Sequence, residues 1–266
     1  MTTQAQKIAW DIINCGLNNA PNTNSVCNPL YSSQACSTLQ DFQIPEPWNG
    51  DIINAPILFV GLNPGFMADE LYPNIGNAYW TKVNGALDSA KVEDFFENRF
   101  NGYYVEHSNG RGFRIKTTSL QKKSLRGRTF WGYIKSIADK ILNTPNSKPG
   151  TDFAITEIVH CKSKNIACIT KKCYEKCLNK HFDNVLYIAK RVEFIVIVGQ
   201  PARESISKYF GIASPNKYKW YNINLDKRPV KIIFLDHNAG GGSAKKVGVL
   251  RLFSLKNLCK MIFLAF

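Results

Sequence analysis

Two apolar segments of the sequence end in polar residues that could do chemistry. The first, ILFVGLNPG at residues 57–65, places Asn63 between apolar side chains and a Pro-Gly turn. An amide both donates and accepts hydrogen bonds, so Asn63 is a candidate for holding a water molecule, and the flanking glycines permit a sharp turn and close approach of a ligand. The second, FLDHNAGGGSAKK at residues 234–246, places His237 at the end of an apolar run.

The second segment continues into three glycines followed by a serine and two lysines. Backbone N–H groups of a glycine-rich stretch before a helix, with adjacent ammonium groups, suit the binding of a phosphate. The sequence therefore predicts a phosphate-binding segment at Gly240, Gly241, Gly242, Ser243, Lys245 and Lys246.

Buried strands and helices are expected to position these residues. Four segments are apolar on both faces, which is typical of parallel strands: 57–60, 153–159, 194–198 and 230–235. Helices are expected at 129–142, 172–190, 202–210 and 245–263. This alternation predicts an α/β fold, one domain over 1–266, with a central parallel four-stranded sheet and helices on both faces. Ligands of such sheets bind beyond the carboxyl ends of the strands, where Asn63 and His237 fall.

The chain is strongly basic. Its 266 residues carry a formal net charge of +14, and 44% of them are hydrophobic. Such a charge favours nucleic acid as a partner, with an anionic membrane surface as the rival. A basic and aromatic-rich insertion at about 95–128 suits a surface that follows phosphates and stacks bases; the alternative is a solvated hairpin.

The lengths of the apolar runs indicate whether the chain contains a membrane-spanning or secretory segment. None approaches the roughly 18 residues of a spanning helix, and the N-terminal residues lack a secretory pattern. We therefore expect a cytoplasmic protein with no membrane partner, and no feature indicates an obligate protein partner. Eight cysteines in such a chain favour metal ligation over disulfides, the alternative being that several are small buried apolar residues.

In this order, GLNPG and the segment beginning with His237 resemble the two motifs of the uracil-DNA glycosylase superfamily. GLNPG looks most like the mismatch-specific and single-strand-selective branches, which implies that Asn63 orients the attacking water. YPNIGNAYW at residues 72–80 is similar to the mismatch-specific branch, and implies that Tyr79 stacks on a flipped base, with Phe130 as the rival. The resemblance further implies that His237 stabilises charge on the departing base.

A second branch, the iron–sulfur glycosylases, resembles the chain in its cysteines. Cys161 follows a strand and Cys177 lies sixteen positions later, as in that branch. The resemblance implies a [4Fe–4S] cluster, with zinc as the alternative metal, completed by Cys27 and Cys36. These two are nine positions apart where that branch has three, and Cys15, Cys168 and Cys173 are further candidates.

The residue expected to read the base departs from the superfamily. Where uracil-reading members carry an Asn, the strand here carries Glu157. An ionised Glu only accepts hydrogen bonds, whereas a protonated Glu matches N3 and N4 of cytosine. The resemblance therefore implies a DNA glycosylase that flips and excises a damaged or modified pyrimidine, including the hypermodified, glucosylated cytosines that anti-phage glycosylases remove. The alternatives are uracil excision in base excision repair, a non-catalytic nucleic-acid-binding module of the same fold, and an unrelated α/β hydrolase.

Overall fold

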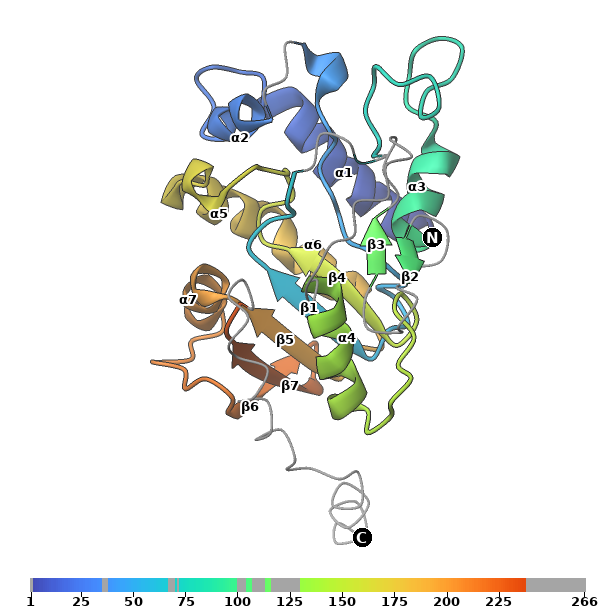
Figure 1. Cartoon of the computed structure of the whole chain (residues 1–266). Coiled ribbons are helices and arrows are strands. Elements are labelled where there is room, and N and C mark those ends of the chain that lie inside the picture. The colour runs from blue at the N-terminus through green and yellow to red at the C-terminus, as the bar shows by residue number, and fades with distance from the viewer. Residues whose placement is uncertain are drawn as a thin grey trace, which may run out of the picture.

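The computed structural model of the chain describes residues 2–34, 38–66, 70, 72–99, 104–106, 113–115 and 130–237. They form an α/β fold around a five-stranded sheet with the strand order β4-β1-β5-β7-β6 (Figure 1). Neighbouring strands from β4 to β7 are parallel, and β6 pairs with β7 in the antiparallel direction. The strands are β1 (Ile57–Gly61), β4 (Phe153–Glu157), β5 (Phe194–Val198), β6 (Trp220–Leu225) and β7 (Arg228–Leu235).

The four parallel strands are those that the sequence predicts, and β6 is a fifth strand that it does not. β6 forms a hairpin with β7 through Asp226 and Lys227, whose φ angles of 47° and 66° are those of a tight left-handed turn. Such a turn is usually signalled by glycine or asparagine, and here neither is present. β6 is an edge strand, and its sequence WYNINL alternates apolar residues with asparagines. It therefore lacks the continuous apolar run by which the other four strands were predicted.

The helices cover both faces of the sheet, as expected. The predicted helix at 129–142 is confirmed as α4, that at 202–210 as α7, and that at 172–190 is divided among α5, a π-helical segment η4 and α6. The predicted helix at 245–263 lies outside the described residues. The helical elements are α1 (Thr3–Asn19), α2 (Asn28–Ser33), η1 (Leu39–Asp41), α3 (Ser89–Glu97), α4 (Phe130–Ile141), η3 (Ile166–Cys168), α5 (Lys171–Cys177), η4 (Leu178–Phe182), α6 (Asp183–Ile188) and α7 (Gln200–Tyr209).

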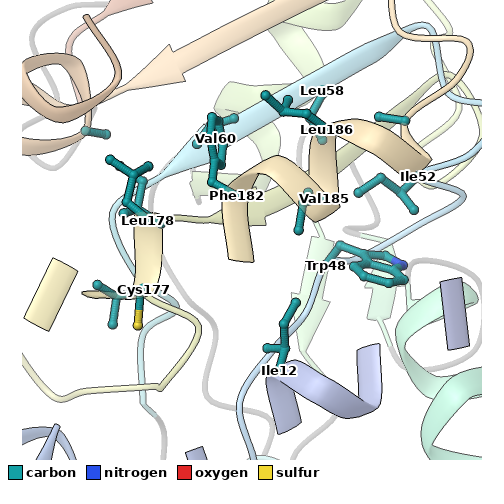
Figure 2. Packing of buried hydrophobic residues seen from close by; sticks show 14 of the residues in the cluster. Ile12, Trp48, Ile52, Leu58, Val60, Cys177, Leu178, Phe182, Val185 and Leu186 are labelled. Carbon is teal, nitrogen blue, oxygen red and sulfur yellow. The ribbon is translucent and has the colours of Figure 1, made fainter. Parts of the chain in front are cut away.

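Two apolar clusters hold these layers together, one on each face of the sheet. Successive side chains of a strand point to opposite faces, so each buried strand supplies both clusters. On one face, Leu58 and Val60 of β1 pack with Phe182 and Leu186 from η4 and α6 (Figure 2). On the other face, Ile57 and Phe59 pack beneath α4 through Tyr133, Ile134 and Ile137. The rigid sheet edge that results carries the site.

The N-terminal third adds a separate cluster in which α1 and α3 meet. Phe95 and Phe96 of α3 are buried there with Trp80 and Tyr72. The predicted basic insertion at about 95–128 therefore begins within a packed helix rather than in a solvated loop. It also contains a short antiparallel pair, β2 (Tyr104–Glu106) and β3 (Phe113–Ile115), and its other residues after Arg99 lie outside the described part of the chain. Among the described residues, no helix combines the length and apolar character needed to cross a membrane.

Candidate active site

The loops that follow β1 and β4 run side by side beyond the carboxyl edge of the sheet. Backbone hydrogen bonds continue between them past the strands, from the Val159 N–H to the Leu62 carbonyl at 2.8 Å and from the Ser163 N–H to the Pro64 carbonyl at 3.2 Å. The Phe66 N–H donates to the Ser163 carbonyl at 2.9 Å. This pairing fixes the conformation of the GLNPG segment.

The Asn63 side chain is oriented by that pairing. Its Nδ2 donates to Ser163 Oγ at 2.8 Å and to the Pro64 carbonyl at 3.0 Å. The Ser163 hydroxyl in turn donates to the Asn165 carbonyl at 2.9 Å, so it presents a lone pair to the amide. Because both amide protons of Asn63 are engaged, Oδ1 is the atom of this side chain that can accept a hydrogen bond from a water molecule.

A cavity of about 560 Å³ opens at this edge of the sheet. It brings together four residues that the sequence analysis selected from separate segments: Asn63, Phe130, Glu157 and His237. Its volume lies within the range of about 300–1,000 Å³ that is usual for small-molecule sites. Its other lining residues are Glu46, Gly61, Leu62, Pro64, Gly65, Phe66, Glu70, Arg99, Lys162, Ser163, Lys164, Asn165, Ile166, Val198, Gly199, Gln200 and Pro201.

Glu157 lies at the end of β4 with its carboxyl group in this cavity. It is 6% exposed, and Oε2 has no hydrogen-bond partner among the described residues. Burial, reinforced by the nearby Glu46 carboxylate, raises the pKa of Glu157 well above its usual value. Burial therefore favours the protonated form of Glu157, in which the carboxyl group offers one O–H donor and a carbonyl acceptor to a ligand.

The absence of a side chain at Gly61 makes room for this carboxyl group. A Cβ built on Gly61 would lie 2.8 Å from the carboxyl carbon of Glu157. β1 and β4 pair in register at these two residues. The first glycine of GLNPG thus has a defined role in packing against the acid.

His237 lies two residues after the end of β7 and lines the same cavity. Its ring stacks on Phe130 at 5.3 Å between centroids and 14° between planes. Desolvation lowers the pKa of His237 below its usual value, so the ring is neutral and offers one N–H donor near neutral pH. The preceding residue, Asp236, is held by an ion pair with Lys217 at 2.7 Å and by the Tyr133 hydroxyl, which donates to the Asp236 carbonyl at 3.1 Å.

The deep wall of the cavity carries four charged side chains that the sequence analysis did not select. Arg99 forms ion pairs with Glu46 and with Glu70, and Lys162 pairs with Glu70 at 2.6 Å. All four residues are at most 5% exposed. Although burial opposes ionisation, the charges of Arg99 and Lys162 lower the pKa of Glu46. We call these four residues the charged wall.

Tyr79 lies away from the cavity. It is not among the lining residues, and it is 49% exposed, with its ring edge-on to Trp80 and under Lys91. Its predicted stacking on a flipped base therefore stays a prediction that the cavity does not support. The apolar side chains that do line the cavity include Phe66 and Ile166, and Ile166 is 62% exposed.

Four buried cysteines gather between α2, α5 and the loop after β4. Hydrogen bonds from Cys173 and Cys177 lower the pKa of Cys27 far below that of an ordinary thiol. Burial raises the pKa of Cys161, and the charges of Cys177 and Cys27 act on the same thiol. The structure therefore joins three predicted ligands, Cys27, Cys161 and Cys177, with Cys173, which the sequence analysis held as a further candidate.

This cysteine cluster suits a thiophilic metal by its donors. The four thiols come from three segments of the chain and are 0–7% exposed. The lowered pKa of Cys27 favours its thiolate, which is the form that ligates metals. Over the described ranges, no three His, Cys, Asp or Glu side chains are already arranged to hold a metal ion. The other candidates are engaged elsewhere: Cys15 Sγ accepts from Lys180 Nζ at 3.1 Å, and Cys168 Sγ lies 3.5 Å from Asn165 Oδ1.

Several predicted site residues lie outside the part of the chain that the structure describes. These are the predicted ligand Cys36 and the phosphate-binding segment Gly240, Gly241, Gly242, Ser243, Lys245 and Lys246. Of the residues that sequence reasoning missed, Ser163 has no clear signal in the sequence. It lies six positions after the end of β4, whereas Asn63 lies two positions after the end of β1, so strand spacing alone does not pair the two.

Comparison with known proteins gives no family assignment. No protein-family model matches the chain, and no curated protein sequence matches it.

Proposed function

We propose that the chain is a DNA glycosylase that hydrolyses the bond between C1′ and N1 of a modified, cytosine-like pyrimidine. The observation that carries the proposal is the buried carboxyl group of Glu157, which lies without a hydrogen-bond partner on Oε2 among the described residues, in the cavity that also contains Asn63 and His237. A neutral acid can donate to N3 and accept from the N4 amino group of cytosine. The same acid can also pair with uracil, by donating to O4 and accepting from the N3–H, so the choice between the two bases is made by the excision test below.

The remaining side chains support a hydrolytic step on a flipped nucleotide. Asn63 Oδ1 would hold a water molecule, since both protons of its amide are already donated. The water oxygen bonds to C1′ as the C1′–N1 bond breaks, and the electron pair leaves with the base. One proton of the water stays on the new sugar hydroxyl, and the other replaces the proton that Glu157 transfers to the departing base.

Glu157 and His237 would make the base a better leaving group. Cytosine departs with developing negative charge, and the Glu157 proton directed at N3 relieves that charge. The neutral His237 ring lines the same cavity and would add an N–H donor for a base oxygen that accumulates charge. The amide of Asn63 cannot act as a base, so we expect a slower enzyme than one with a carboxylate at this position.

Two features support DNA as the molecule that contains the excised base. The chain has a net charge of +14, which favours a polyanion. Ile166 is an exposed apolar side chain at the rim of the cavity, flanked in sequence by Asn165 and close to Lys164. Proteins that unstack bases insert apolar side chains of this kind between them. Ile166 would thus occupy the space that the flipped base leaves.

The cysteine cluster is proposed to hold a [4Fe–4S] cluster through Cys27, Cys161, Cys173 and Cys177, with zinc as the alternative. A metal group bound there would join α2, α5 and the loop after β4, and its contribution would be structural. No step of the hydrolysis involves it.

The test is excision from defined oligonucleotides. Purified protein is incubated with DNA that carries uracil, mismatched thymine, 5-hydroxymethylcytosine or its glucosylated form, and alkali-labile abasic sites are scored, with Asn63→Ala as the control. We expect abasic sites at a modified cytosine and none with the control. Excision confined to uracil would replace the proposed substrate, and no excision from any DNA would reject the enzyme.

A further inference from the structure

A helical surface beside the cavity is strongly basic. The segment from residue 158 to residue 182, which leads from β4 through α5 into η4, contains six lysines and one acidic residue. Five of these lysines are exposed, and the sixth, Lys162, belongs to the charged wall. By contrast, the nine residues of α3 contain three acids and one lysine. The positive charge of the chain is therefore unevenly distributed, and it is high beside the cavity.

Three of the exposed lysines lie on one side of the helix. Lys172, Lys176 and Lys180 are four positions apart, a spacing that places successive side chains on the same helix face. Two contacts with α1 fix that side, because Lys176 Nζ donates to Asn19 Oδ1 at 3.3 Å and Lys180 Nζ donates to Cys15 Sγ at 3.1 Å. We call Lys172, Lys176 and Lys180 the lysine ridge.

The charge of the lysine ridge is not neutralised by its surroundings. Glu175, the one acid of the segment, pairs with Lys171 at 3.9 Å. The next acid along the chain, Asp183, accepts a hydrogen bond from the Tyr209 hydroxyl. The chain has no Asp or Glu from residue 12 to residue 40, the stretch that includes the part of α1 beside the ridge. Within the described ranges no carboxylate pairs with a ridge lysine, so the ridge attracts anions from solution.

The lysine ridge starts close to the cavity. Lys164 and Ile166 line the cavity, and α5 begins five residues after Ile166. Five residues span at most about 18 Å, and Thr170 Oγ caps α5 by accepting from the Cys173 N–H at 3.2 Å. In Figure 1, α5 lies on the side of the sheet toward which β5 and β7 point. A nucleic acid with one nucleotide in the cavity would therefore have its neighbouring backbone within reach of the ridge.

The dimensions of the lysine ridge suit backbone phosphates. From Lys172 to Lys180 the helix rises about 12 Å, and each strand of a duplex carries a phosphate about every 3.4 Å along its axis, so the ridge spans about three to four phosphates. An anionic membrane surface is a poorer match, because a helix that binds there inserts its apolar face. The apolar face of α5, with Cys173 and Cys177, is buried in the protein.

We infer that the lysine ridge binds the phosphate backbone of duplex DNA next to the nucleotide that enters the cavity. The choice of DNA rests on the proposed function. The ridge is a contact surface separate from the segments near 95–128 and 240–246 that the sequence predicts for nucleic acid. Phosphate contacts fix the orientation of a duplex without reading its sequence, so the ridge holds the DNA while the cavity selects the base.

The test is the salt dependence of binding to an unmodified duplex, followed by fluorescence anisotropy. The triple variant Lys172→Gln, Lys176→Gln and Lys180→Gln should bind at least about tenfold more weakly than the unaltered protein at low salt. The slope of log affinity against log salt concentration should become shallower by about 2 to 3, because each phosphate contact contributes about 0.9 to it. Lys172→Gln alone, which disturbs neither contact with α1, should lower the slope by about 1 and keeps the inference testable if the triple variant does not fold.

The matched control removes the same charge at the opposite edge of the sheet. Lys148, Lys190 and Lys227 are exposed and precede β4, β5 and β7, so they lie at the amino ends of the strands. Their triple substitution by Gln should leave the salt slope close to that of the unaltered protein. Equal losses in the two triple variants would show that only the net charge matters, and would overturn the ridge.

The outcomes separate this inference from the proposed function, because binding of unmodified DNA needs no excision. A protein that binds duplex DNA through the ridge but excises no base would reject the glycosylase and support the ridge. Excision together with a salt slope that the ridge substitutions leave unchanged would support the glycosylase and overturn the ridge. Ridge substitutions that weaken binding to phosphatidylserine vesicles and not to DNA would also overturn it, in favour of a membrane surface.

Discussion

Asn63 Nδ2 lies 2.8 Å from the hydroxyl oxygen of Ser163, although the two residues are one hundred positions apart in the sequence. They meet because β1 and β4 are adjacent parallel strands and their loops continue to pair beyond the sheet. The serine hydroxyl and the Pro64 carbonyl together use both amide protons of Asn63. The orientation of the proposed water-holding oxygen therefore depends on Ser163.

Replacing Ser163 tests this dependence. Ser163→Ala removes one of two acceptors for the Asn63 amide, which is worth about 1 kcal/mol, so we expect kcat to fall about fivefold to tenfold with little change in KM. Ser163→Thr retains the hydroxyl and should recover most of the rate. Single-turnover excision measures both variants. An Ala variant as fast as the unaltered protein would show that Asn63 is oriented by other means.

The protonation state of Glu157 predicts a pH dependence of both activity and stability. Excision requires the protonated acid, so the rate should fall as pH rises through its raised pKa. Glu157→Gln keeps a donor and an acceptor for N3 and N4 but has no transferable proton. We expect this variant to bind the modified DNA normally, to excise at least about tenfold more slowly, and to lose the alkaline decline in rate.

The same substitution should change how unfolding depends on pH. Because the folded-state pKa of Glu157 is raised, its contribution to stability is fully present below the unfolded pKa and is lost as pH rises through the folded value. Thermal melts of the unaltered protein should therefore show a decline above about pH 4.5 that is shallower in Glu157→Gln. Parallel melting curves for the two proteins would show that the acid is ionised in the folded state.

Gly61 should not tolerate a side chain. In Gly61→Ala the new methyl group would meet the buried Glu157 carboxyl group, which would have to shift from its position in the cavity. We expect a loss of about 1–3 kcal/mol in the free energy of unfolding, together with a larger loss of excision than of DNA binding. Gly65→Ala is the matched control, since a Cβ there meets no atom within 4 Å. Equal behaviour of the two variants in chemical denaturation would contradict the packing argument.

Ile166 should matter for duplex DNA and not for single strands. In a duplex the flipped base leaves a gap in the base stack that Ile166 would fill, whereas a single strand has no such gap. Ile166→Ala should therefore lower the rate of excision from a duplex about tenfold and leave the rate on single-stranded DNA nearly unchanged. Ile166→Leu should restore the duplex rate. Val83, an exposed apolar residue that does not line the cavity, provides the control substitution Val83→Ala. Equal losses on both DNA forms would assign Ile166 to folding or general binding.

The cysteine cluster predicts a metal content that follows particular residues. Cys173→Ser and Cys177→Ser should each lower the bound iron, or zinc, per chain and lower the melting temperature, while Cys168→Ser should change neither. Elemental analysis and the visible thiolate–iron absorption distinguish iron from zinc. A full metal content in Cys173→Ser would restore Cys36 as the fourth ligand that the sequence resemblance implies.

The residues proposed to act on the base and on C1′ could be predicted from the sequence because they follow the ends of buried strands. Asn63, Glu157 and His237 each end a buried apolar run, and parallel strands bring such ends to one edge. The charged wall was not accessible in this way. Arg99 belongs to a stretch that reads as basic surface, yet it pairs with carboxylates 29 and 53 positions away that lie in irregular segments. No periodicity marks such partners, because only the tertiary packing selects them.

The edge strand and the cysteines show the same limit. β6 is only partly buried and alternates apolar residues with Asn222 and Asn224, so it lacks the continuous apolar run of the predicted strands, and its turn has uncommon residues, Asp226 and Lys227. Cys173 and Cys177 are four positions apart on α5 and so share a helix face, which spacing alone could have indicated. That Cys27 meets them depends on how α2 packs against this region.

The most direct test of the glycosylase is to follow the oxygen that attacks C1′. Duplex DNA with one glucosylated 5-hydroxymethylcytosine is treated with the protein in water enriched in oxygen-18, and the products are analysed by mass spectrometry. We expect an intact modified base, released without label, and an abasic sugar that carries one oxygen-18 atom, both absent with Asn63→Ala. Unchanged DNA, or strand cleavage that leaves the base attached to its sugar, would contradict the account.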